Sequence, residues 1–394
     1  MAARRKITVL FVNHVSQISG AEKSLMSLVQ ELRRSERHDY TLLAACPDGP
    51  LASELERAGV KVFPMPMPRF YRKDGAVRLS GKFPAWMGAV RELVGIIGRQ
   101  RVDIIHANSA EAQMHAMAAA RFAKIPSVWH ARDLAPLSGA GRLLGRGAAK
   151  VIAISDAVAA CLVAQGVPRK RVVRIYNGID VSAIQQSVGQ IGPLDAPNSS
   201  RWIVMVAQLV PWKRHSDFIR AMAIIAPEFE EAHGLIVGAD LMNDHPRHAG
   251  RLKSLAARLG VGGRISFLGQ RDDVASIVAS SEMLVLPSEA EPFGRAALEA
   301  MALARPVVGT RAGGLPELVE DGETGLLVPV RKPAQLAEAI AKLLLDATRA
   351  RQMGERGLDR AQRLFSARQC ASEVERVYEE MLAAKPARRG VAKS

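Results

Sequence analysis

The sequence predicts an α/β protein built from two doubly wound parallel sheets, one in each half of the chain. Short apolar runs alternate with helical stretches through both halves, which is the pattern of strand–helix–strand units. A polar break over residues 185–200, with Gly192, Pro193 and Pro197, divides the two halves. The length of 394 residues is enough for two sizeable cores. We therefore expect residues 1–190 and 191–365 to form separate domains with a substrate cleft between them.

The individual elements follow from this alternation. The strands expected in the first half are Ile7–Val12, Tyr40–Ala45, Asp103–His106, Ser127–His130, Lys150–Ile154 and Val172–Tyr176. The helices expected between them are Ala21–Leu32, Ala85–Gly98, Ala110–Phe122 and Ala157–Ala164. The strands expected in the second half are Trp202–Val206, Leu235–Val237, Ile265–Leu268, Met283–Leu286, Pro306–Val308 and Leu326–Val328. After Val330 we expect helix, first over Pro333–Leu345 and then over 349–383 with breaks, followed by a basic disordered tail at 385–394.

Composition limits the class of protein. Hydrophobic residues make up 48% and charged residues 24% of the chain, as in ordinary globular proteins. No apolar run approaches the roughly 18 to 20 residues that cross a bilayer, and Ile7–Val12 is too short for the apolar part of a secretory signal. Cys46, Cys161 and Cys370 match neither a disulfide framework nor a metal-binding spacing. The expected location is therefore the cytoplasm.

The net charge of +15 is concentrated in the first half. Residues 1–190 hold 27 Lys and Arg against 14 Asp and Glu, whereas the remainder holds 27 against 25. This asymmetry indicates an anionic partner for the first half, such as a membrane surface, a nucleic acid or an acidic substrate. Nucleic acid is not expected, because no zinc-finger spacing or aromatic RNA-binding run is present.

A basic segment between Arg69 and Arg101 holds eight Lys and Arg against two acidic residues. It also carries an apolar stripe at helical spacing, formed by Trp86, Val90, Leu93, Val94 and Ile97. The stripe either rests on an anionic membrane or packs on the sheet, and packing is slightly favoured. A peripheral position at the inner face of the membrane therefore stays open.

The most informative stretch is residues 288–301, SEAEPFGRAALEAM. An apolar run precedes it and helix-favouring residues follow, so it predicts a strand, a loop with Glu291, and a helix with Glu299 about two turns in. Free backbone N–H groups near Phe293 and Gly294 suit an anion at the helix start. Two carboxylates beside a phosphate-binding site suit a nucleotide sugar, because its hydroxyls need acceptors and its diphosphate needs donors. The alternative is a charged loop with a solvated Glu299, but carboxyl ends of parallel strands are where such sheets bind ligands.

This stretch resembles the E-x7-E signature of retaining glycosyltransferases of family 4, which have the GT-B fold. The resemblance covers nearly the whole chain and is strongest between residues 202 and 330. It implies that the second domain holds the nucleotide sugar, that the first presents the acceptor, and that a helix at 366–384 crosses back to the first domain. By the same resemblance Glu291 holds sugar hydroxyls, Glu299 the ribose and Lys213 the diphosphate, while Gly294 offers its backbone N–H. No cofactor is implied, because the nucleotide sugar is a substrate.

Residues 207–215, AQLVPWKRH, are similar to the family's G-R-L-x-x-x-K-G segment, whose Arg and Lys neutralise the donor diphosphate. Lys213 matches the Lys. Gln208 stands at the Arg position, where it can hydrogen-bond a phosphate oxygen but carries no charge. Arg214 replaces the usual glycine and is the candidate for the missing charge. The departure leaves the two-cation clamp an open question.

Two histidines each end an expected strand. In the segment SVWHARD, His130 matches the histidine that the family places beside the transferred sugar, where it hydrogen-bonds a hydroxyl. His106 lies in a similar segment, and a satisfied core residue is an equally good interpretation for it. Gly20, after NHVSQIS, looks like the family's glycine-rich loop with Ser19 in place of the second glycine; a plain turn is an equally good interpretation.

The remaining motifs follow the same resemblance. Residues 309–317, GTRAGGLPE, match the family's G-G-x-P-E loop, and Gln270 and Arg271 lie where family members bind the base. No Asp-x-Asp is present, so a metal-bridged diphosphate is not expected.

These observations predict a retaining, metal-independent hexosyltransferase acting on a hydroxyl acceptor that is lipid-linked or part of a polysaccharide or glycoconjugate. Two alternatives stay open. One is a nucleotide-sugar 2-epimerase of the same fold, for which Asp133 is the attractive additional carboxylate. The other is a catalytically silent protein that binds membrane surfaces through its basic half.

Overall fold

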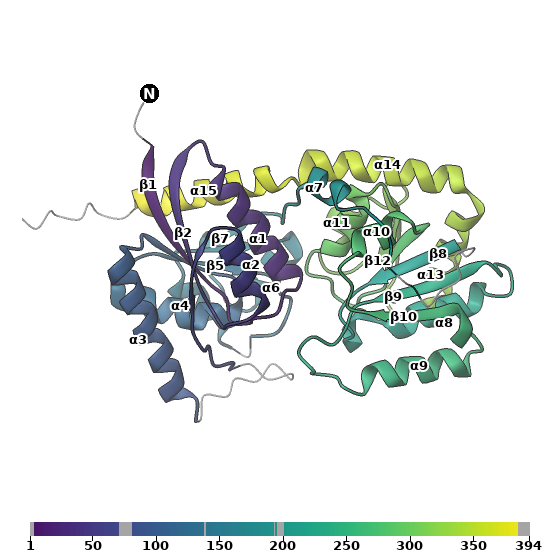
Figure 1. Ribbon diagram of the computed structural model, residues 1–394, viewed down its shortest axis with the longest axis horizontal. Coiled ribbons are helices and arrows are strands. Elements are labelled where there is room, and N and C mark those ends of the chain that lie inside the picture. The colour runs from purple at the N-terminus through teal and green to yellow at the C-terminus, as the bar shows by residue number, and fades with distance from the viewer. Residues whose placement is uncertain (1–3, 71–80, 138, 193, 195–200, 385–394) are drawn as a thin grey trace, which may run out of the picture. The chain divides into compact units, whose positions relative to one another are not determined.

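The computed structural model describes residues 4–70, 81–137, 139–192, 194 and 201–384. The expected tail, and residues 193 and 195–200 of the interdomain break, lie outside the described residues. The chain divides into two compact units. The first contains residues 1–154, 158–178 and 367–394, and the second contains residues 155–157 and 179–366. Each unit has a parallel sheet with helices on both faces (Figure 1), so the predicted pair of doubly wound parallel sheets is confirmed.

The first unit contains a seven-stranded sheet with the order β3-β2-β1-β4-β5-β6-β7. Its strands are β1 Arg5–Val12, β2 His38–Cys46, β3 Lys61–Pro64, β4 Ile104–Ala107, β5 Ser127–Ala131, β6 Lys150–Ala153 and β7 Val172–Arg174. The helices are α1 Gly20–Arg33, α2 Pro50–Arg57, α3 Phe83–Gln100, α4 Ala110–Ala123, α5 Gly141–Gly147, α6 Asp156–Ala164 and α15 Ala367–Ala383, with a 3-10 turn at Arg169–Arg171. The first two residues of α6 group with the second unit. Because β4 and β5 are parallel neighbours, their carboxyl ends bring His106 and His130 together.

Apolar side chains cover both faces of this sheet. On one face the core contains residues of α1, α2 and α15, and α15 lies against α1 (Figure 1). On the other face it contains residues of α3 and α4. The stripe on α3 belongs to this second core: Val90, Leu93 and Ile97 are buried, and Trp86 and Val94 pack against them. The stripe therefore packs on the sheet.

The second unit contains a six-stranded sheet with the order β10-β9-β8-β11-β12-β13. Its strands are β8 Arg201–Val206, β9 Ala232–Val237, β10 Ile265–Gly269, β11 Met283–Leu286, β12 Val307–Thr310 and β13 Gly325–Val328. The helices are α7 Val181–Gln186, α8 His215–Ile225, α9 His248–Arg258, α10 Val274–Ala279, α11 Arg295–Ala302, α12 Leu315–Leu318, α13 Pro333–Leu345 and α14 Ala347–Leu364, with 3-10 turns at Pro211–Lys213 and Gly262–Arg264. The central strands β8 and β11 are buried, which fits their continuous apolar sequences.

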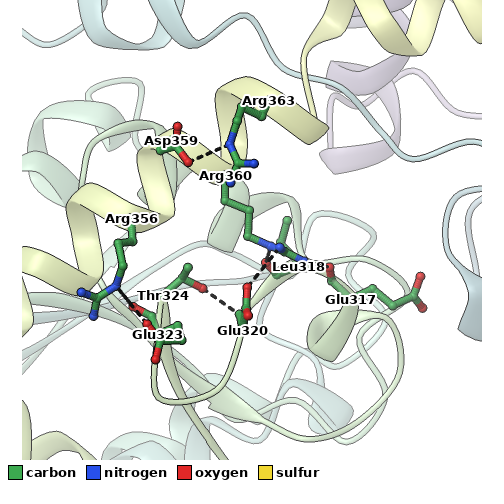
Figure 2. Close-up of polar contacts among 9 residues, drawn as sticks. All are labelled: Glu317, Leu318, Glu320, Glu323, Thr324, Arg356, Asp359, Arg360 and Arg363. Atoms are coloured by element: carbon green, nitrogen blue, oxygen red, sulfur yellow. Dashed lines mark hydrogen bonds and ion pairs between the residues drawn. The ribbon is translucent and has the colours of Figure 1, made fainter.

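Helix α14 holds the loop between α12 and β13 in place (Figure 2). Arg360 donates from Nε to the carbonyl of Leu318 at 3.0 Å and from Nη2 to that of Glu317 at 3.1 Å, and its Nη1 lies 3.3 Å from Glu320. One turn earlier, Arg356 donates to the carbonyl of Glu323 at 2.8 Å. The two carbonyl bonds of Arg360 satisfy groups that the short helix α12 leaves without intrahelical partners, and Arg356 bonds the loop that follows it. Among the described residues, no helix combines the length and apolarity needed to cross a bilayer.

Candidate functional site

The second unit gathers polar side chains at the carboxyl end of β11. Glu291 lies in the loop after this strand and is only 6% exposed. Its Oε2 accepts a hydrogen bond from Lys213 Nζ at 2.6 Å and another from Ser288 Oγ at 3.0 Å. Lys213 comes from the loop after β8, the neighbouring strand, so the parallel sheet itself brings the two segments together. A charge-assisted bond at this distance fixes the carboxylate in one orientation.

The G-G-x-P-E loop supports the backbone of Glu291. The N–H of Gly314 donates to the carbonyl of Glu291 at 2.7 Å. Gly313 has φ +60°, and a Cβ atom there would lie 2.1 Å from that same carbonyl oxygen. Glycine is required at this position for both reasons, because a side chain would be strained and would displace Glu291.

Helix α11 begins directly after this loop. Gly294 precedes it with φ +104°, and Phe293 is buried. Glu299 lies in the second turn, as predicted from the sequence, and Arg295 donates from Nε to its Oε1 at 2.8 Å. The helix start presents backbone N–H groups without intrahelical acceptors, which is an electrostatically favourable place for an anion.

The guanidinium of Arg214 contacts two carboxylates. It adopts the left-handed conformation with φ 57°. Its Nε and Nη2 each donate to Asp217 at 2.9 Å, and its Nη1 lies 3.4 Å from Glu289. Gln208 is half-buried at the end of β8, and its carbonyl accepts from the N–H of Val210. The described contacts therefore bring Lys213 to Glu291 and Arg214 to other acidic residues.

The predicted base-binding residues follow β10. Gln270 is exposed. Arg271 donates from Nε and Nη2 to Asp273 at 2.8 and 2.6 Å, and these bonds lower the pKa of Asp273 to about 2. Asp273 also accepts from the N–H of Gly192 at 2.8 Å, so this pair anchors the segment that leads into the second unit.

The first unit contains a buried polar network. His106 and His130 are at most 1% exposed, and His106 Nε2 lies 3.1 Å from His130 Nδ1. Tyr378 of α15 reaches the other side of His106, with its hydroxyl 2.6 Å from Nδ1. Arg132 Nη2 lies 3.3 Å from His130 Nδ1. Within the described part of the chain, His130 Nε2 is buried without a hydrogen-bond partner.

Burial determines the charge state of these histidines. It lowers the pKa of His106 to about 3 and that of His130 well below its usual value, with Arg132 adding to both shifts. Both rings are therefore neutral at physiological pH. In the second unit, burial similarly lowers the pKa of His215, beside Arg214, to about 3.

Gly20 is exposed at the start of α1. Ser19, which stands where the family has a second glycine, takes part in a helix cap. Its backbone N–H and its hydroxyl both donate to Glu22, at 3.0 and 2.6 Å. The S-x-x-E spacing of Ser19 and Glu22 is the sequence signal of this capping box.

Three polar residues of the buried network in the first unit were not predicted from the sequence. Arg132 donates to Asn108 at 2.8 Å and to Asn177 at 2.7 Å, so the asparagines that follow β4 and β7 hold it in the network. The signal was present, since each of the three residues lies one or two positions after the end of an expected strand. Asp133, the residue required by the epimerase alternative, is exposed after β5. In the described segments, no group of three or more His, Cys, Asp or Glu has an arrangement that could hold a metal ion.

Two family models match the chain. Residues 18–183 match the model described as Glycosyltransferase Family 4, and residues 190–360 match the model described as Glycosyl transferases group 1. The N-acetyl-alpha-D-glucosaminyl L-malate synthase of Bacillus anthracis is 33% identical over 217 residues, which cover 55% of each protein. A D-inositol 3-phosphate glycosyltransferase of Corynebacterium glutamicum is 31% identical over 219 residues, covering 54% of this chain and 50% of that protein. The chain spans about half the length of these curated relatives.

Solved glycosyltransferase structures resemble this protein over nearly the whole chain. Anabaena Alr3699/HepE in complex with UDP and glucose matches with a TM-score of 0.79 at 25% identity, covering 95% of this chain and 99% of that one. The lipopolysaccharide outer core galactosyltransferase WaaB, at 14% identity and a TM-score of 0.68, shares the fold. The fold is therefore GT-B, and the chain belongs to the group 1 glycosyltransferases of family 4.

Proposed function

We propose that this protein is a retaining glycosyltransferase that moves a sugar from a uridine-diphosphate donor to a hydroxyl acceptor. The observation that carries the proposal is the Lys213–Glu291–Ser288 cluster at the carboxyl end of β11, next to the start of α11. The uridine nucleotide is proposed because HepE, 25% identical over nearly its whole length, has been solved with UDP-glucose.

In this proposal the donor diphosphate lies at the start of α11. Lys213 has three N–H donors, so it can keep its bond to Glu291 and still donate to a phosphate oxygen. Both described bonds to Glu291 go to Oε2, which leaves Oε1 to accept from a sugar hydroxyl. Glu299 accepts from the ribose in place of, or together with, its bond to Arg295. Gln270 and Arg271 contact the base, and Gly20 lies near the acceptor or the phosphate.

The chemistry that we propose needs neither a metal ion nor a covalent enzyme intermediate. Lys213 and the backbone N–H groups of Phe293 and Gly294 stabilise the charge that develops on the leaving diphosphate. A phosphate oxygen takes the proton of the acceptor hydroxyl, which attacks from the leaving-group side and so retains the anomeric configuration. Gln208 contributes a hydrogen bond without charge, and Arg214 contributes only if it exchanges Asp217 for phosphate.

His130 is proposed as the first unit's contribution to the sugar site. Its buried ring is neutral, and its Nε2 faces no partner among the described residues. A neutral imidazole offers one N–H donor, which suits a hydroxyl rather than a phosphate. The basic excess of the first half suits an acceptor that carries anionic groups or is linked to lipid at an anionic membrane surface.

The first experiment is a thermal-shift panel of purified protein with UDP, GDP, ADP and the matching nucleotide sugars. Selective stabilisation by UDP and UDP-sugars is expected, because a ligand of the native state raises its stability. The absence of a shift with every nucleotide would contradict the donor site and favour the surface-binding alternative. Incubation with UDP-sugars alone tests the epimerase alternative, which predicts an isomerised sugar without any acceptor.

The site residues are tested by substitution. Glu291→Ala and Lys213→Ala are each expected to abolish transfer while the protein remains folded. The double variant Lys213→Met with Glu291→Gln is the stability control, because it leaves neither charge buried without a partner. Full activity in either single variant would remove that residue from the assignment. The anomeric configuration of the product, read by NMR, decides whether the reaction is retaining.

A further inference from the structure

The buried network in the first unit connects three elements that lie far apart in the sequence. Tyr378 lies on α15, His106 at the end of β4, and His130 at the end of β5. The hydroxyl of Tyr378 is 2.6 Å from His106 Nδ1, and His106 Nε2 is 3.1 Å from His130 Nδ1. All three side chains are at most 1% exposed. Water therefore does not compete for these bonds, and the hydrogen bonding of each side chain depends on the next side chain in the network.

The chemistry of the groups decides the direction of each bond. Arg132 can only donate, so its contact with His130 Nδ1 makes that nitrogen an acceptor. His106 Nε2 faces the same acceptor and must therefore carry the proton of a neutral ring. His106 Nδ1 is then an acceptor, and the hydroxyl of Tyr378 donates to it. The proton of neutral His130 consequently lies on Nε2, the nitrogen without a partner among the described residues.

We propose that Tyr378 and His106 are positioning residues that hold His130 in the tautomer with its proton on Nε2, so that this N–H is ready to donate to a substrate hydroxyl. The inference rests on the proposed place of His130 beside the transferred sugar. In this relay Tyr378 acts on His130 through His106. The C-terminal helix α15 thereby contributes to the sugar site through the orientation of a proton.

Packing supports the arrangement. The ring of Tyr378 meets that of His106 edge-on, with centroids 5.9 Å apart, and the His106 and His130 rings are 5.2 Å apart. Tyr378 also lies in the core formed with α1 and the sheet. A buried hydroxyl in an apolar core is costly unless it is bonded. A phenylalanine would fill the same space without that requirement, so packing alone does not explain the hydroxyl.

The first test is the tautomeric state itself, measured by long-range ¹H–¹⁵N NMR of the imidazoles in the full chain at neutral pH. His130 and His106 are each expected to carry their proton on Nε2. In Tyr378→Phe, the Nδ1 resonance of His106 is expected to lose its hydrogen-bond shift, and that of His130 to move with it. The matched control is Tyr40→Phe, which removes a hydroxyl from the ring packed edge-on against Tyr378. It should leave both histidine spectra unchanged.

The second test is kinetic and uses the transferase assay. Tyr378→Phe is expected to lower kcat about five- to tenfold with little change in KM for the donor, because the N–H is needed most when charge develops on the sugar. His106→Gln keeps an N–H donor near the position of Nε2 and should retain more activity than His106→Leu. A purely structural role would lower the stability of all three variants without this order of kcat values.

The outcomes separate this inference from the proposed function. A proton on His130 Nδ1 in the wild-type protein would overturn the relay whatever the activity. Equal kcat values for wild type and Tyr378→Phe, with unchanged histidine spectra, would do the same. A wild-type protein with the expected tautomers but no transferase activity would contradict the proposed function while leaving the relay in place. If Tyr378→Phe does not fold, the wild-type spectrum and the two His106 variants still decide.

Discussion

Replacement of Gly313 by alanine tests how the G-G-x-P-E loop supports the proposed donor site. Gly313 has φ +60°, a conformation that costs a residue with a Cβ roughly 1–2 kcal/mol. The added Cβ would also lie 2.1 Å from the carbonyl oxygen of Glu291 and 2.8 Å from its nitrogen. Both neighbours are backbone atoms, so the clash is relieved only if the loop or the Glu291 segment moves.

The size of the effect follows from these distances. Ordinary van der Waals contact begins at 3.4 Å, so the carbonyl must retreat by about 1.3 Å. Such overpacking costs about 1–3 kcal/mol, which adds to the conformational cost for a total of about 2–5 kcal/mol. A displacement of this size in a substrate-binding group costs on the order of 100-fold in activity. Gly322→Ala is the matched control, because Gly322 has φ +83° and nothing lies within 4 Å of its added Cβ.

The assay is native-state hydrogen exchange of the β11 and β12 amides, which reports the stability of the second unit by itself. Gly313→Ala is expected to lose about 1–3 kcal/mol more than Gly322→Ala, and to bind UDP at least tenfold more weakly, whereas Gly322→Ala should bind UDP normally. Equal losses of stability in the two variants would refute the clash. Unchanged UDP binding in Gly313→Ala would refute the link between this loop and the donor site.

Further predictions concern buried charges and ring protonation. Arg360→Ala should destabilise the second unit by about 2 kcal/mol in a denaturation assay, because two carbonyls of α12 and the Glu320 carboxylate lose their partner. The control is the exposed Arg363, whose replacement by alanine removes the ion pair with Asp359 and should cost under about 0.5 kcal/mol in the same assay. His215, whose pKa is lowered to about 3, stays neutral in the folded state as the pH falls below 6.5, while the unfolded state takes up a proton. The contribution of His215 to stability should therefore be complete above pH 6.5 and fall by about 2 kcal/mol by pH 5. His215→Leu should lose about that much less stability than the wild-type protein between pH 7 and pH 5, and an equal loss in the two proteins would contradict the assignment. Glu291→Gln should abolish transfer yet bind free UDP severalfold more tightly by calorimetry, because Lys213 no longer shares its charge with a carboxylate; weaker binding would contradict this sharing.

The sequence predicted the elements that position the candidate site because their signals are local. The run Met283–Leu286 is continuous and apolar, as a central parallel strand must be, and the helix at 295–302 follows a glycine that allows a left-handed residue. Strand β3 was missed because Lys61–Pro64 is an edge strand without a fully buried residue. Helix α5 was missed because it contains three glycines, which disfavour helix. All three allow close packing, since a Cβ on Gly141, Gly145 or Gly147 would clash with Gln165, Val167 or Met117, respectively.

The partners of the site residues were less predictable than their positions. Asp217 is three residues after Arg214, a spacing visible in the sequence, but Glu289 reaches the same arginine only through the fold. The bond between His106 and Tyr378 spans 272 residues and depends on where α15 packs. Local patterns determine strands, helices and caps, whereas such pairings depend on tertiary packing.

The ion pairs of the second unit affect how the proposed donor site would bind a diphosphate and release it. Lys213 is bound to Glu291, and Arg295 to Glu299, so each cation near the start of α11 already has a carboxylate partner. In the proposed donor site a diphosphate would share Lys213 with Glu291, so it would gain less than it would from an unpaired cation. Gln208, in place of a second cation, would weaken the attraction further. On this proposal the same features favour departure of the nucleoside diphosphate after transfer, because Lys213 still has Glu291 as its partner when the phosphate leaves. A site that bound the diphosphate with two unpaired cations would stabilise the leaving group more strongly but would also retain the product longer.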